Sequence, residues 1–394
     1  MRTGRSLWET FPAPRVPYGP LKKNISVDVL IIGAGITGAL VADALVDEGF
    51  KVAIADTRGP AKGSTTASTA LVQYECDTPL IRLGKQIGKR NAVRAWRRSR
   101  LAVDSIGARL ESLGLKDMAR RNSLYLAGDL LDSDALMQEH HARLAAGLAS
   151  RHLDRKALRE RFGLSRSAAL LSHGNLTINP REATLALLKS ACTRNVEIFS
   201  PCEIVDIDAG SRGVTATAAN GEHIRCKNLI LAAGYEFPDS VRVRGHEIVS
   251  TWVIATVPQK RPAWPEQCLI WEASEKYLYL RTTSDGRIIC GGEDEDFSSA
   301  EKRDALLSRK TRALQRKLSR MIPSADARVE FAWTGSFGTT PTGLPKIGSV
   351  PGMPHCWAAL GYGGNGTTFA QIAADVIRGA LTNRPDTDAD LYRL

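Results

Sequence analysis

The fold is decided by residues 27–38, which read Val-Asp-Val-Leu-Ile-Ile-Gly-Ala-Gly-Ile-Thr-Gly. The first half of this stretch is apolar and rich in β-branched residues, as expected of a parallel strand that is buried on both faces. Helix-forming residues follow from Ala39 to Glu48, Gly49 stops the helix, and a second apolar run covers Lys51 to Ala55. This order of strand, glycine turn, helix and strand predicts a βαβ unit.

The glycines of this turn fit the Gly-x-Gly-x-x-Gly pattern of dinucleotide-binding folds. They let backbone N–H groups approach a pyrophosphate at the positive end of the helix. Asp56 follows roughly 20 residues later and can accept hydrogen bonds from the adenosine ribose hydroxyls. The alternative is a tight strand-to-helix turn without a ligand, and the pattern does not distinguish NAD from FAD. Its predicted cofactor contacts are Gly33, Gly35, Ile36, Thr37, Gly38, Asp56 and Thr57.

Three later features favour FAD. Residues 63–69 form a cluster of small side chains, hydroxyls and backbone donors where the chain returns past the cofactor, although a flexible loop has the same composition. An apolar strand ends at Gly234, and a glycine-rich turn precedes the last helix, which is expected from Gly366 to about Leu381. The N–H groups of that helix face negative charge favourably. The contacts predicted here are Ser64, Thr65, Ser68, Thr69, Ala233, Gly234, Gly363, Gly364, Asn365, Gly366, Thr367 and Thr368.

Composition bounds the class of protein. A chain of 394 residues predicts two domains, and 43% hydrophobic content is ordinary for a globular protein. The net charge of +11 is densest at residues 85–100, where apolar residues at helical spacing predict an amphipathic helix with a solvated basic face. A nucleic-acid-binding stretch is the alternative.

The seven scattered cysteines indicate reduced thiols and no metal site, and we expect a cytoplasmic protein with no signal peptide and no transmembrane segment.

Five segments together carry a family resemblance: 27–38, 229–234, 333–335, 342–348 and 361–368. They resemble the FAD-dependent oxidoreductases of the D-amino-acid oxidase and glycine oxidase superfamily, especially the bacterial branch that oxidises amines such as γ-glutamylputrescine. The resemblance runs from Trp8 almost to the C-terminus. It departs from the family at Ser64-Thr65-Thr66-Ala67-Ser68, where many relatives carry a run similar to Ala-Ser-Gly-Arg-Asn, and at Asp56, where relatives usually have Glu.

The resemblance implies an α/β fold with a Rossmann-like FAD-binding domain that is interleaved with a substrate domain, the latter built on a mainly antiparallel sheet plus helices. The FAD-binding segments are then 27–85, 173–235 and 331–394, and the substrate segments are 86–172 and 236–330. Residues 1–26 form an arm that packs through Trp8, Phe11 and Tyr18. The resemblance also implies dissociable FAD, a backbone contact of Ile204 with the adenine, and Gly343, Leu344 and Lys346 near the flavin.

The substrate side is predicted from one strand, residues 277–283. Tyr277, Tyr279 and Arg281 alternate along it and therefore share a face, which can hold a substrate through phenolic hydrogen bonds and a guanidinium. The alternative is an outer, solvated face. We assign Tyr279, Arg281 and Lys346 to catalysis and Tyr277, Trp252 and Tyr362 to substrate binding. Further candidates for the wall are His246, Trp271 and Trp333.

These residues predict oxidation of the C–N bond of an amine or amino acid by hydride transfer to flavin N5, which gives an imine that hydrolyses. No dedicated general base is evident. An alternative is an FAD-dependent dehydrogenase that passes electrons to a quinone or a protein partner instead of O2. A nucleic-acid-binding protein is a third, weaker hypothesis. The sequence does not identify the substrate, the electron acceptor or the oligomeric state.

Overall fold

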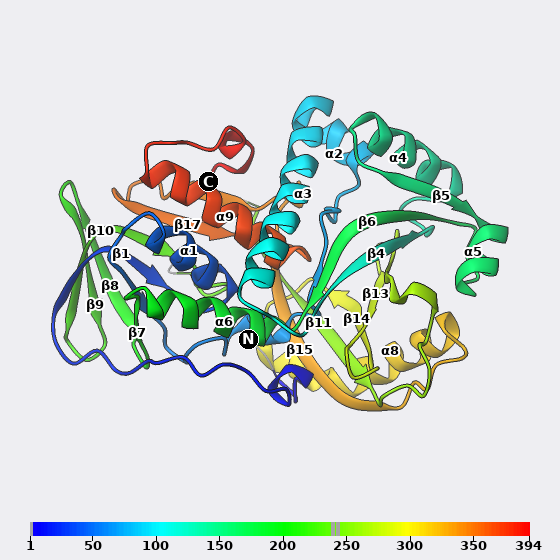
Figure 1. Ribbon diagram of the computed structural model, residues 1–394, viewed down its shortest axis with the longest axis horizontal. Helices are drawn as coiled ribbons and strands as arrows, with labels where there is room; N and C mark the ends of the chain where they lie inside the picture. Colours follow the sequence, from blue (N-terminus) through cyan, green and yellow to red (C-terminus); the bar gives the residue numbers. More distant parts are fainter. Residues whose placement is uncertain (1–2, 238–240, 242–244) are drawn as a thin grey trace.

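A computed structural model describes residues 3–237, 241 and 245–394 of the chain. Figure 1 shows two β-sheets side by side, with helices on their outer faces and α3 (Lys89–Ser112) standing between the two halves. This arrangement confirms the predicted α/β fold class. The chain passes repeatedly from one sheet to the other, because strands of both sheets alternate along the sequence.

The first sheet is built around a parallel core in the order β17-β10-β1-β2-β7. An edge strand, β16, pairs with β17 in the antiparallel direction, and the ribbon β8–β9 extends antiparallel from β10. Its strands are β1 (Ile25–Ile32), β2 (Val52–Ala55), β7 (Glu197–Phe199), β8 (Ile204–Gly210), β9 (Gly213–Ala218), β10 (His223–Leu231), β16 (Lys346–Ser349) and β17 (Cys356–Leu360).

Both faces of β1 are buried, which explains its unbroken apolar sequence. Val29 and Ile31 pack in the core formed with the helices, whereas Leu30 points to the opposite core, which includes residues of β8 to β10. Three helices cover the first face: α1 (Ile36–Val46), α6 (Pro180–Thr193) and α9 (Gly366–Leu381). The final helix lies at the predicted residues.

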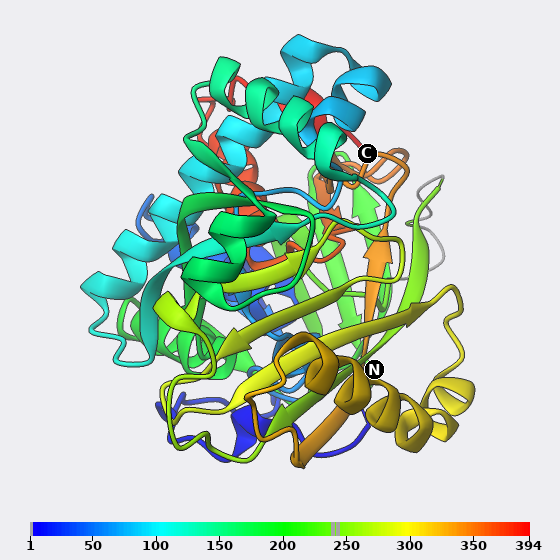
Figure 2. The same ribbon diagram turned by 90° about the vertical axis from the view of Figure 1, so that its right-hand side faces the viewer.

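The second sheet has the order β15-β11-β14-β13-β12-β4-β6-β3, with β5 beside β6. All of its neighbours pair antiparallel except β12 and β4. Figure 2 looks at this end of the molecule and shows α8 (Leu307–Met321) below the sheet and α2 (Leu80–Ile87) and α4 (Ser133–Ala145) above it. Two short helices, α5 (Arg155–Phe162) and α7 (Ala300–Ala305), flank it. The strands are β3 (Leu71–Val72), β4 (Met118–Leu126), β5 (Ser150–Asp154), β6 (Ala168–Ile178), β11 (Glu247–Thr256), β12 (Leu269–Glu272), β13 (Leu278–Thr282), β14 (Ile288–Glu295) and β15 (Val329–Thr339).

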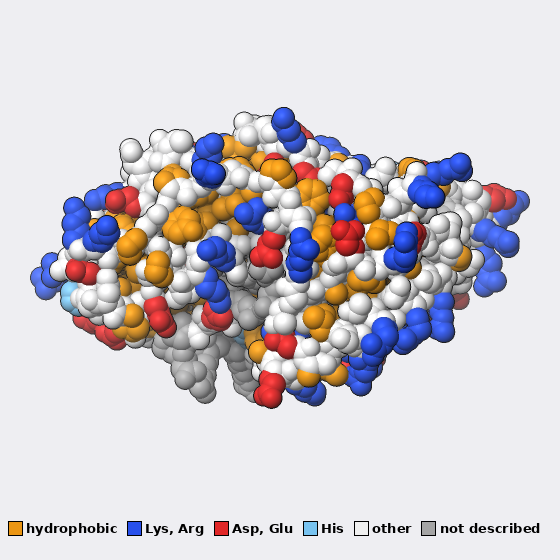
Figure 3. Space-filling model, turned by 90° about the horizontal axis from the view of Figure 1, so that it is seen from below, with side chains coloured by type: hydrophobic (Ala, Val, Ile, Leu, Met, Phe, Trp, Pro, Cys, Tyr) orange, Lys and Arg blue, Asp and Glu red, His pale blue; other side chains and the backbone are white. Residues whose placement is uncertain are grey.

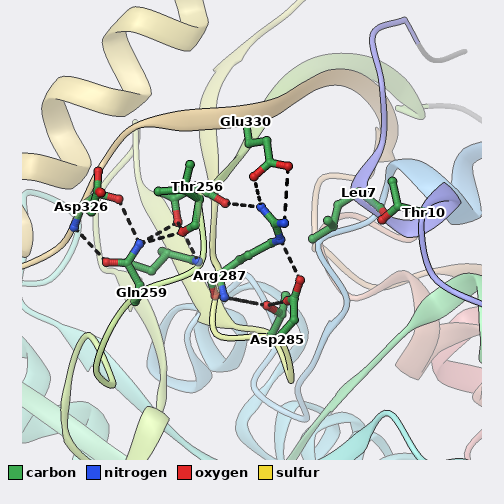
Figure 4. Close-up of polar contacts among 11 residues, drawn as sticks. Leu7, Thr10, Thr256, Gln259, Asp285, Arg287, Asp326 and Glu330 are labelled. Atoms are coloured by element: carbon green, nitrogen blue, oxygen red, sulfur yellow. Dashed lines mark hydrogen bonds and ion pairs between the residues drawn. The ribbon is translucent and has the colours of Figure 1, made fainter.

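A hairpin joins β13 and β14, and Arg287 fastens it to its neighbours (Figure 4). Its guanidinium donates from Nε to Asp285 Oδ2 over 2.7 Å and from Nη1 to the Thr256 carbonyl over 3.0 Å, and it also pairs with Glu330 on β15. One side chain therefore connects β11, β15 and the turn, which stabilises the far edge of the second sheet.

Three strands depart from the segments expected for the two domains. β3, the end of β6 and most of β15 lie in the second sheet, although their residues fall in the predicted FAD-binding segments. These strands lead the chain from one sheet into the other, and the sequence carries no turn signal where the sheet changes. The domain boundaries themselves stay a prediction.

The N-terminal arm packs mainly through its first half. Ser6 Oγ donates to the Thr66 carbonyl over 2.6 Å and the Trp8 indole N–H donates to the Ser68 carbonyl over 2.7 Å. Phe11 lies beside Trp8, with ring centroids 6.2 Å apart. The expectation for Tyr18 is wrong, because its side chain is 49% exposed. The arm thus closes over the Ser64–Thr69 segment.

The basic stretch 85–100 forms parts of two helices, α2 and α3, which are separated at Gly88 with φ of 84°. The predicted solvated face is only partly correct. Arg98 is buried and donates to Asp375 over 2.8 Å and to Asp386 over 2.9 Å, while Arg94 pairs with Asp388 and Asp390. Acidic residues of α9 and the C-terminal segment therefore neutralise two of the seven basic residues of this stretch, which weakens the argument for nucleic-acid binding.

Other basic residues remain on the surface. Figure 3 shows Lys and Arg side chains gathered toward the right-hand end of one face. All seven cysteines are free, and six of them are buried. Among the helices of the described residues, none combines the length and the apolar content needed to cross a membrane.

The ion pairs of Arg98 give a test of the packing between α3 and the C-terminal segment. We expect Arg98→Met to lower the free energy of unfolding by about 3 kcal/mol, because it leaves two half-buried carboxylates without their cation. Urea unfolding followed by circular dichroism measures the change. Arg90→Met is the matched control, since Arg90 is exposed on the same helix. Equal stability of the two variants would contradict this account of α3.

Candidate active site

One large cavity of about 1060 Å³ lies between the two sheets. Its walls come from the ends of β1, β2 and β10, from β8, and from β11, β12, β13 and β15 of the second sheet. The carboxyl ends of parallel strands are where open α/β sheets bind ligands. The cavity therefore begins at the predicted dinucleotide turn and ends on the second sheet.

The turn between β1 and α1 leaves no room for side chains. A Cβ on Gly33, whose φ is +114°, would lie 2.4 Å from the Ala232 carbonyl oxygen, and a Cβ on Gly38 would lie 1.9 Å from the Gly33 carbonyl oxygen. The N-cap residue Gly35 offers no side-chain acceptor to the first turn of α1. The positive end of α1 thus opens on the cavity, as an anionic pyrophosphate requires.

Asp56 lines the cavity beside this turn and also fixes the neighbouring loop. Its Oδ2 accepts the Ala34 N–H over 2.8 Å, and its Oδ1 accepts the N–H groups of Arg58 and Gly59 over 2.8 and 2.7 Å. Each carboxylate oxygen has two lone pairs, so acceptor capacity remains. The predicted contact with a ribose hydroxyl is compatible with this geometry and stays a prediction.

The segment 64–69 approaches the same turn from the other side. Ser64–Ala67 forms a 3-10 helix, and Thr65 Oγ1 accepts the Ile36 N–H over 3.0 Å. This bond fixes the first turn of α1 against the segment. The predicted residues that line the cavity here are Gly33, Gly35, Ile36, Thr37, Asp56, Thr57, Ser64, Thr65, Ser68, Thr69, Ile204, Ala233 and Gly234. Gly38 lies just behind them.

The entry to α9 contributes Gly363, Gly364, Gly366 and Thr367 to the cavity lining. The side chains of Asn365 and Thr368 turn away from it. Asn365 Nδ2 donates to the carbonyls of Gln73 and Glu75, and Thr368 Oγ1 donates to the Gln73 carbonyl over 2.7 Å. These two side chains fasten α9 to residues 73–75. This role differs from the predicted direct contact with the cofactor.

Three residues that the family resemblance places near the flavin lie outside the cavity lining. Gly343 packs against Thr78, and Leu344 is buried in the core. Lys346 Nζ donates to the Arg393 carbonyl over 3.0 Å. Because β16 is an edge strand, its first residue reaches the C-terminal segment. We therefore correct the assignment of Lys346 to catalysis.

The aromatic wall of the cavity comes from the second sheet: Trp271, Tyr277 and Tyr279. The rings of Tyr277 and Tyr279 lie 5.5 Å apart, and Trp271 stacks on Tyr125 at 3.8 Å. Tyr279 Oη and Thr251 Oγ1 are 3.1 Å apart and share a hydrogen bond. Burial raises the pKa of both tyrosines well above the usual value, so both phenols stay protonated. Tyr362, the other predicted wall residue, also lines the cavity.

Arg281 is not part of this wall, which corrects the prediction. Its side chain is 1% exposed and its Nη1 donates to the carbonyls of Ala70 and Ile178 over 2.9 and 2.8 Å. Its guanidinium also lies over the Trp8 ring. Burial lowers the pKa of Arg281 to about 9. Arg281 does share a face with Tyr279, but β3, β6 and the N-terminal arm cover that end of the face.

Three further aromatic candidates lie behind the wall. Trp252 is fully buried and its indole N–H donates to the Arg303 carbonyl over 3.1 Å, on the face of β11 opposite to Thr251. Strand alternation explains this placement, because the neighbour Thr251 faces the cavity. Trp333 donates to the Ala67 carbonyl over 2.9 Å, and the His246 ring packs against Gly338. None of the three is a cavity-lining residue, so the prediction for Trp252 is wrong.

Sequence reasoning missed the run Gln73-Tyr74-Glu75-Cys76-Asp77. Gln73, Glu75 and Asp77 line the cavity, while Tyr74 and Cys76 point into the core. Asp77 Oδ2 accepts the Gly364 N–H over 2.7 Å, and burial raises the pKa of this carboxyl. The alternation of polar and apolar residues was the available signal. This alternation predicts that Gln73, Glu75 and Asp77 share a face, but it does not predict that this face lines a cavity.

Several buried polar atoms of the lining lack a partner among the described residues. They are Gln73 Nε2, Glu75 Oε2 and Trp271 Nε1. Buried polar groups in native proteins are nearly always hydrogen-bonded, so these atoms require partners from a ligand or from ordered water that fills the cavity. Together with the glycine turn that admits no Cβ, they show that the cavity fits a dinucleotide at one end and a polar ligand at the other.

The contact of Gly38 with Gly33 provides a test of the cofactor end. We expect Gly38→Ala to lower the affinity for FAD at least about tenfold, because the methyl group displaces α1 from the pyrophosphate position. Absorbance of the purified protein in the flavin bands, with far-UV circular dichroism as the fold check, measures it. Gly19→Ala is the control, since nothing lies within 4 Å of its added Cβ. Full flavin content in Gly38→Ala would contradict the assignment.

Comparison with known proteins agrees with this geometry. The family model described as FAD dependent oxidoreductase (DAO) matches residues 28–378. Gamma-glutamylputrescine oxidoreductase of Escherichia coli K12 is 21% identical, over 92% of this chain and 86% of that protein. Glycine oxidase of Pseudomonas aeruginosa is 24% identical, over 91% and 96%. The crystal structure of glycine oxidase from Geobacillus kaustophilus superposes with a TM-score of 0.74 at 18% identity, covering 92% and 96% of the two chains. The chain belongs to the DAO family of FAD-dependent oxidoreductases.

Proposed function

We propose that this FAD-dependent oxidoreductase oxidises the C–N bond of an amine or amino acid. The observation that carries the proposal is the continuity of one cavity from the glycine turn at Gly33 to the aromatic wall at Tyr279. A dinucleotide bound at the turn and a small molecule bound at the wall meet inside it. The relatives named for glycine and γ-glutamylputrescine oxidation support the same class of substrate.

Separate sets of the described residues are assigned to the cofactor and to the substrate. The open N-terminus of α1 would bind the pyrophosphate, the β8 residues near Ile204 would hold the adenine, and the α9 entry at Gly363 and Gly364 would contact the ring. Bound FAD supplies a two-electron acceptor at flavin N5. The wall of Trp271, Tyr277 and Tyr279 orients the substrate and excludes water from it.

The substrate reacts as a neutral amine. The C–H bond next to nitrogen breaks, the hydrogen leaves with its electron pair as hydride to the electron acceptor, and the nitrogen lone pair forms the C=N bond. Loss of one N–H proton to solvent then gives the neutral imine. Water then adds to the imine carbon and the amine or ammonia leaves, which gives a carbonyl product. The two electrons pass afterwards to O2 or to another acceptor.

We also propose that FAD is held without a covalent bond. The described cavity lining contains no histidine, and its one cysteine, Cys202, lies beside Ile204 at the adenine end rather than at the aromatic wall. The seven free cysteines suit a reducing compartment, so we place the protein in the cytoplasm.

Denaturation tests the mode of attachment. We expect heat or trichloroacetic acid to release all of the yellow chromophore into the supernatant, because only non-covalent contacts hold it. Absorbance of the pellet and the supernatant gives the two fractions. Flavin that stays with the precipitated chain would refute dissociable binding.

Anaerobic bleaching tests the reaction itself. Holoenzyme mixed with a panel of amines, amino acids and opines is expected to lose its flavin absorbance with at least one of them, since hydride transfer reduces the ring. Comparing O2 consumption with dye reduction then identifies the acceptor. Unchanged absorbance with the whole panel would rule out the proposed reaction.

The phenol of Tyr279 gives a residue-level test. We expect Tyr279→Phe to lower kcat/KM about tenfold, because it removes a hydroxyl that faces the cavity and bonds to Thr251. Stopped-flow reduction under anaerobic conditions measures the effect. Tyr18→Phe serves as control, since that side chain is exposed on the arm. An unaffected rate in Tyr279→Phe would remove this residue from the substrate site.

A further inference from the structure

We infer that the substrate end of the cavity selects a diamine: a compound with the reacting amine, a second protonated amino group, and no carboxylate. The inference rests on the proposed function and narrows its substrate class. It is carried by the charges and unpaired polar atoms around the aromatic wall.

The charged groups at this end are carboxylates. Glu75 and Asp77 line the cavity, and Asp294 lies behind Thr251. Asp77 and Asp294 both act electrostatically on Tyr277 and on Tyr279, which places them at the aromatic wall rather than at the dinucleotide turn. Burial raises the pKa of Asp77, and no cation of the described residues acts on this carboxyl. Burial also raises the pKa of Asp294 to about 7, although the nearby Lys310 opposes that rise.

The cations of the described residues are engaged elsewhere. Arg58 lines the cavity near the dinucleotide turn, but its guanidinium donates two hydrogen bonds to Glu236 over 2.8 and 2.7 Å. Arg281 is saturated by backbone carbonyls. Arg143 is fully buried, pairs with Glu139 over 2.9 Å, also acts electrostatically on Glu75, and is not a lining residue. The described part of the wall thus offers no guanidinium or ammonium to a substrate carboxylate.

A second, independent observation points to a bound donor. Glu75 is 2% exposed; its Oε1 accepts hydrogen bonds from Ser123 and Asn175, but its Oε2 has no partner in the described structure. A carboxylate oxygen accepts only, so the missing partner is a hydrogen-bond donor. An ammonium group supplies that donor together with a positive charge beside Asp77, on which no cation of the described residues acts.

The chemistry assigns that charge to a second amino group. The nitrogen next to the carbon that gives up hydride must be neutral to form the C=N bond, so it does not neutralise a carboxylate. A separate ammonium does so, and the faces of Trp271, Tyr277 and Tyr279 stabilise it further. A carboxylate in its place would add a like charge beside buried acids, which is a strong penalty.

The test compares three substrates of similar length: butane-1,4-diamine, butylamine and 4-aminobutanoate. With holoenzyme under anaerobic conditions, we expect the diamine to reduce the flavin with a kcat/KM at least about tenfold above butylamine, and 4-aminobutanoate to be slower still. Equal rates for diamine and butylamine, or a faster 4-aminobutanoate, would overturn the inference while the proposed function stands. If no amine or amino acid reduces the flavin, the proposed function fails and the inference with it.

Two variants locate the effect. Asp77→Asn keeps an acceptor for the Gly364 N–H, and Glu75→Gln keeps one for Ser123. Each is expected to raise KM for the diamine about tenfold and to lower the ratio of kcat/KM for the diamine to that for butylamine by about the same factor, because only the second ammonium loses a partner. Flavin content confirms that each variant is folded. If both variants lower the rates with diamine and butylamine equally, the carboxylates act only on the structure and the inference is wrong.

Discussion

The approach of three backbone segments at Gly33 sets the geometry of the whole molecule. The carboxyl end of β1, the first turn of α1 and the end of β10 meet so closely that a Cβ on Gly33 or Gly38 would overlap a carbonyl oxygen. The helix axis therefore points its positive end past the edge of the sheet, and Thr65 fastens it there through the Ile36 N–H. The close approach at Gly33 and the Thr65 hydrogen bond therefore hold together the dinucleotide turn, the Ser64–Thr69 segment and Ala232.

The second sheet forms the substrate side of the cavity. Its strands carry the aromatic wall across the cavity, and the run from Gln73 to Asp77 crosses from one sheet toward the other beneath α9. Arg281 fixes two points where the chain passes between the sheets: its guanidinium bonds to the carbonyls of Ala70, just before β3, and of Ile178, at the end of β6. Arg281, which we expected to bind the substrate, instead stabilises the second sheet. Carboxylates lie at the substrate end of the cavity.

The cofactor end could be predicted because its chemistry is local. A strand, three spaced glycines and a helix start define a pyrophosphate site within twelve residues, and most residues predicted there do line the cavity. The substrate end could not be predicted as fully. Alternation in β13 correctly places Tyr277, Tyr279 and Arg281 on one face, but it cannot say that the arm and β3 cover Arg281. Glu75 and Asp77 were missed because distant segments, α9 and β6, decide that they meet the cavity.

A crystal structure of the protein with FAD would show directly whether one cavity, shared by both sheets, holds the cofactor and the substrate. The account predicts density for the pyrophosphate at the N-terminus of α1, for the adenine beside Ile204, and for the isoalloxazine ring between the α9 entry and the wall of Tyr277 and Tyr279. A flavin ring that lies away from this wall, or a pyrophosphate that does not contact the Gly33–Gly38 turn, would contradict it.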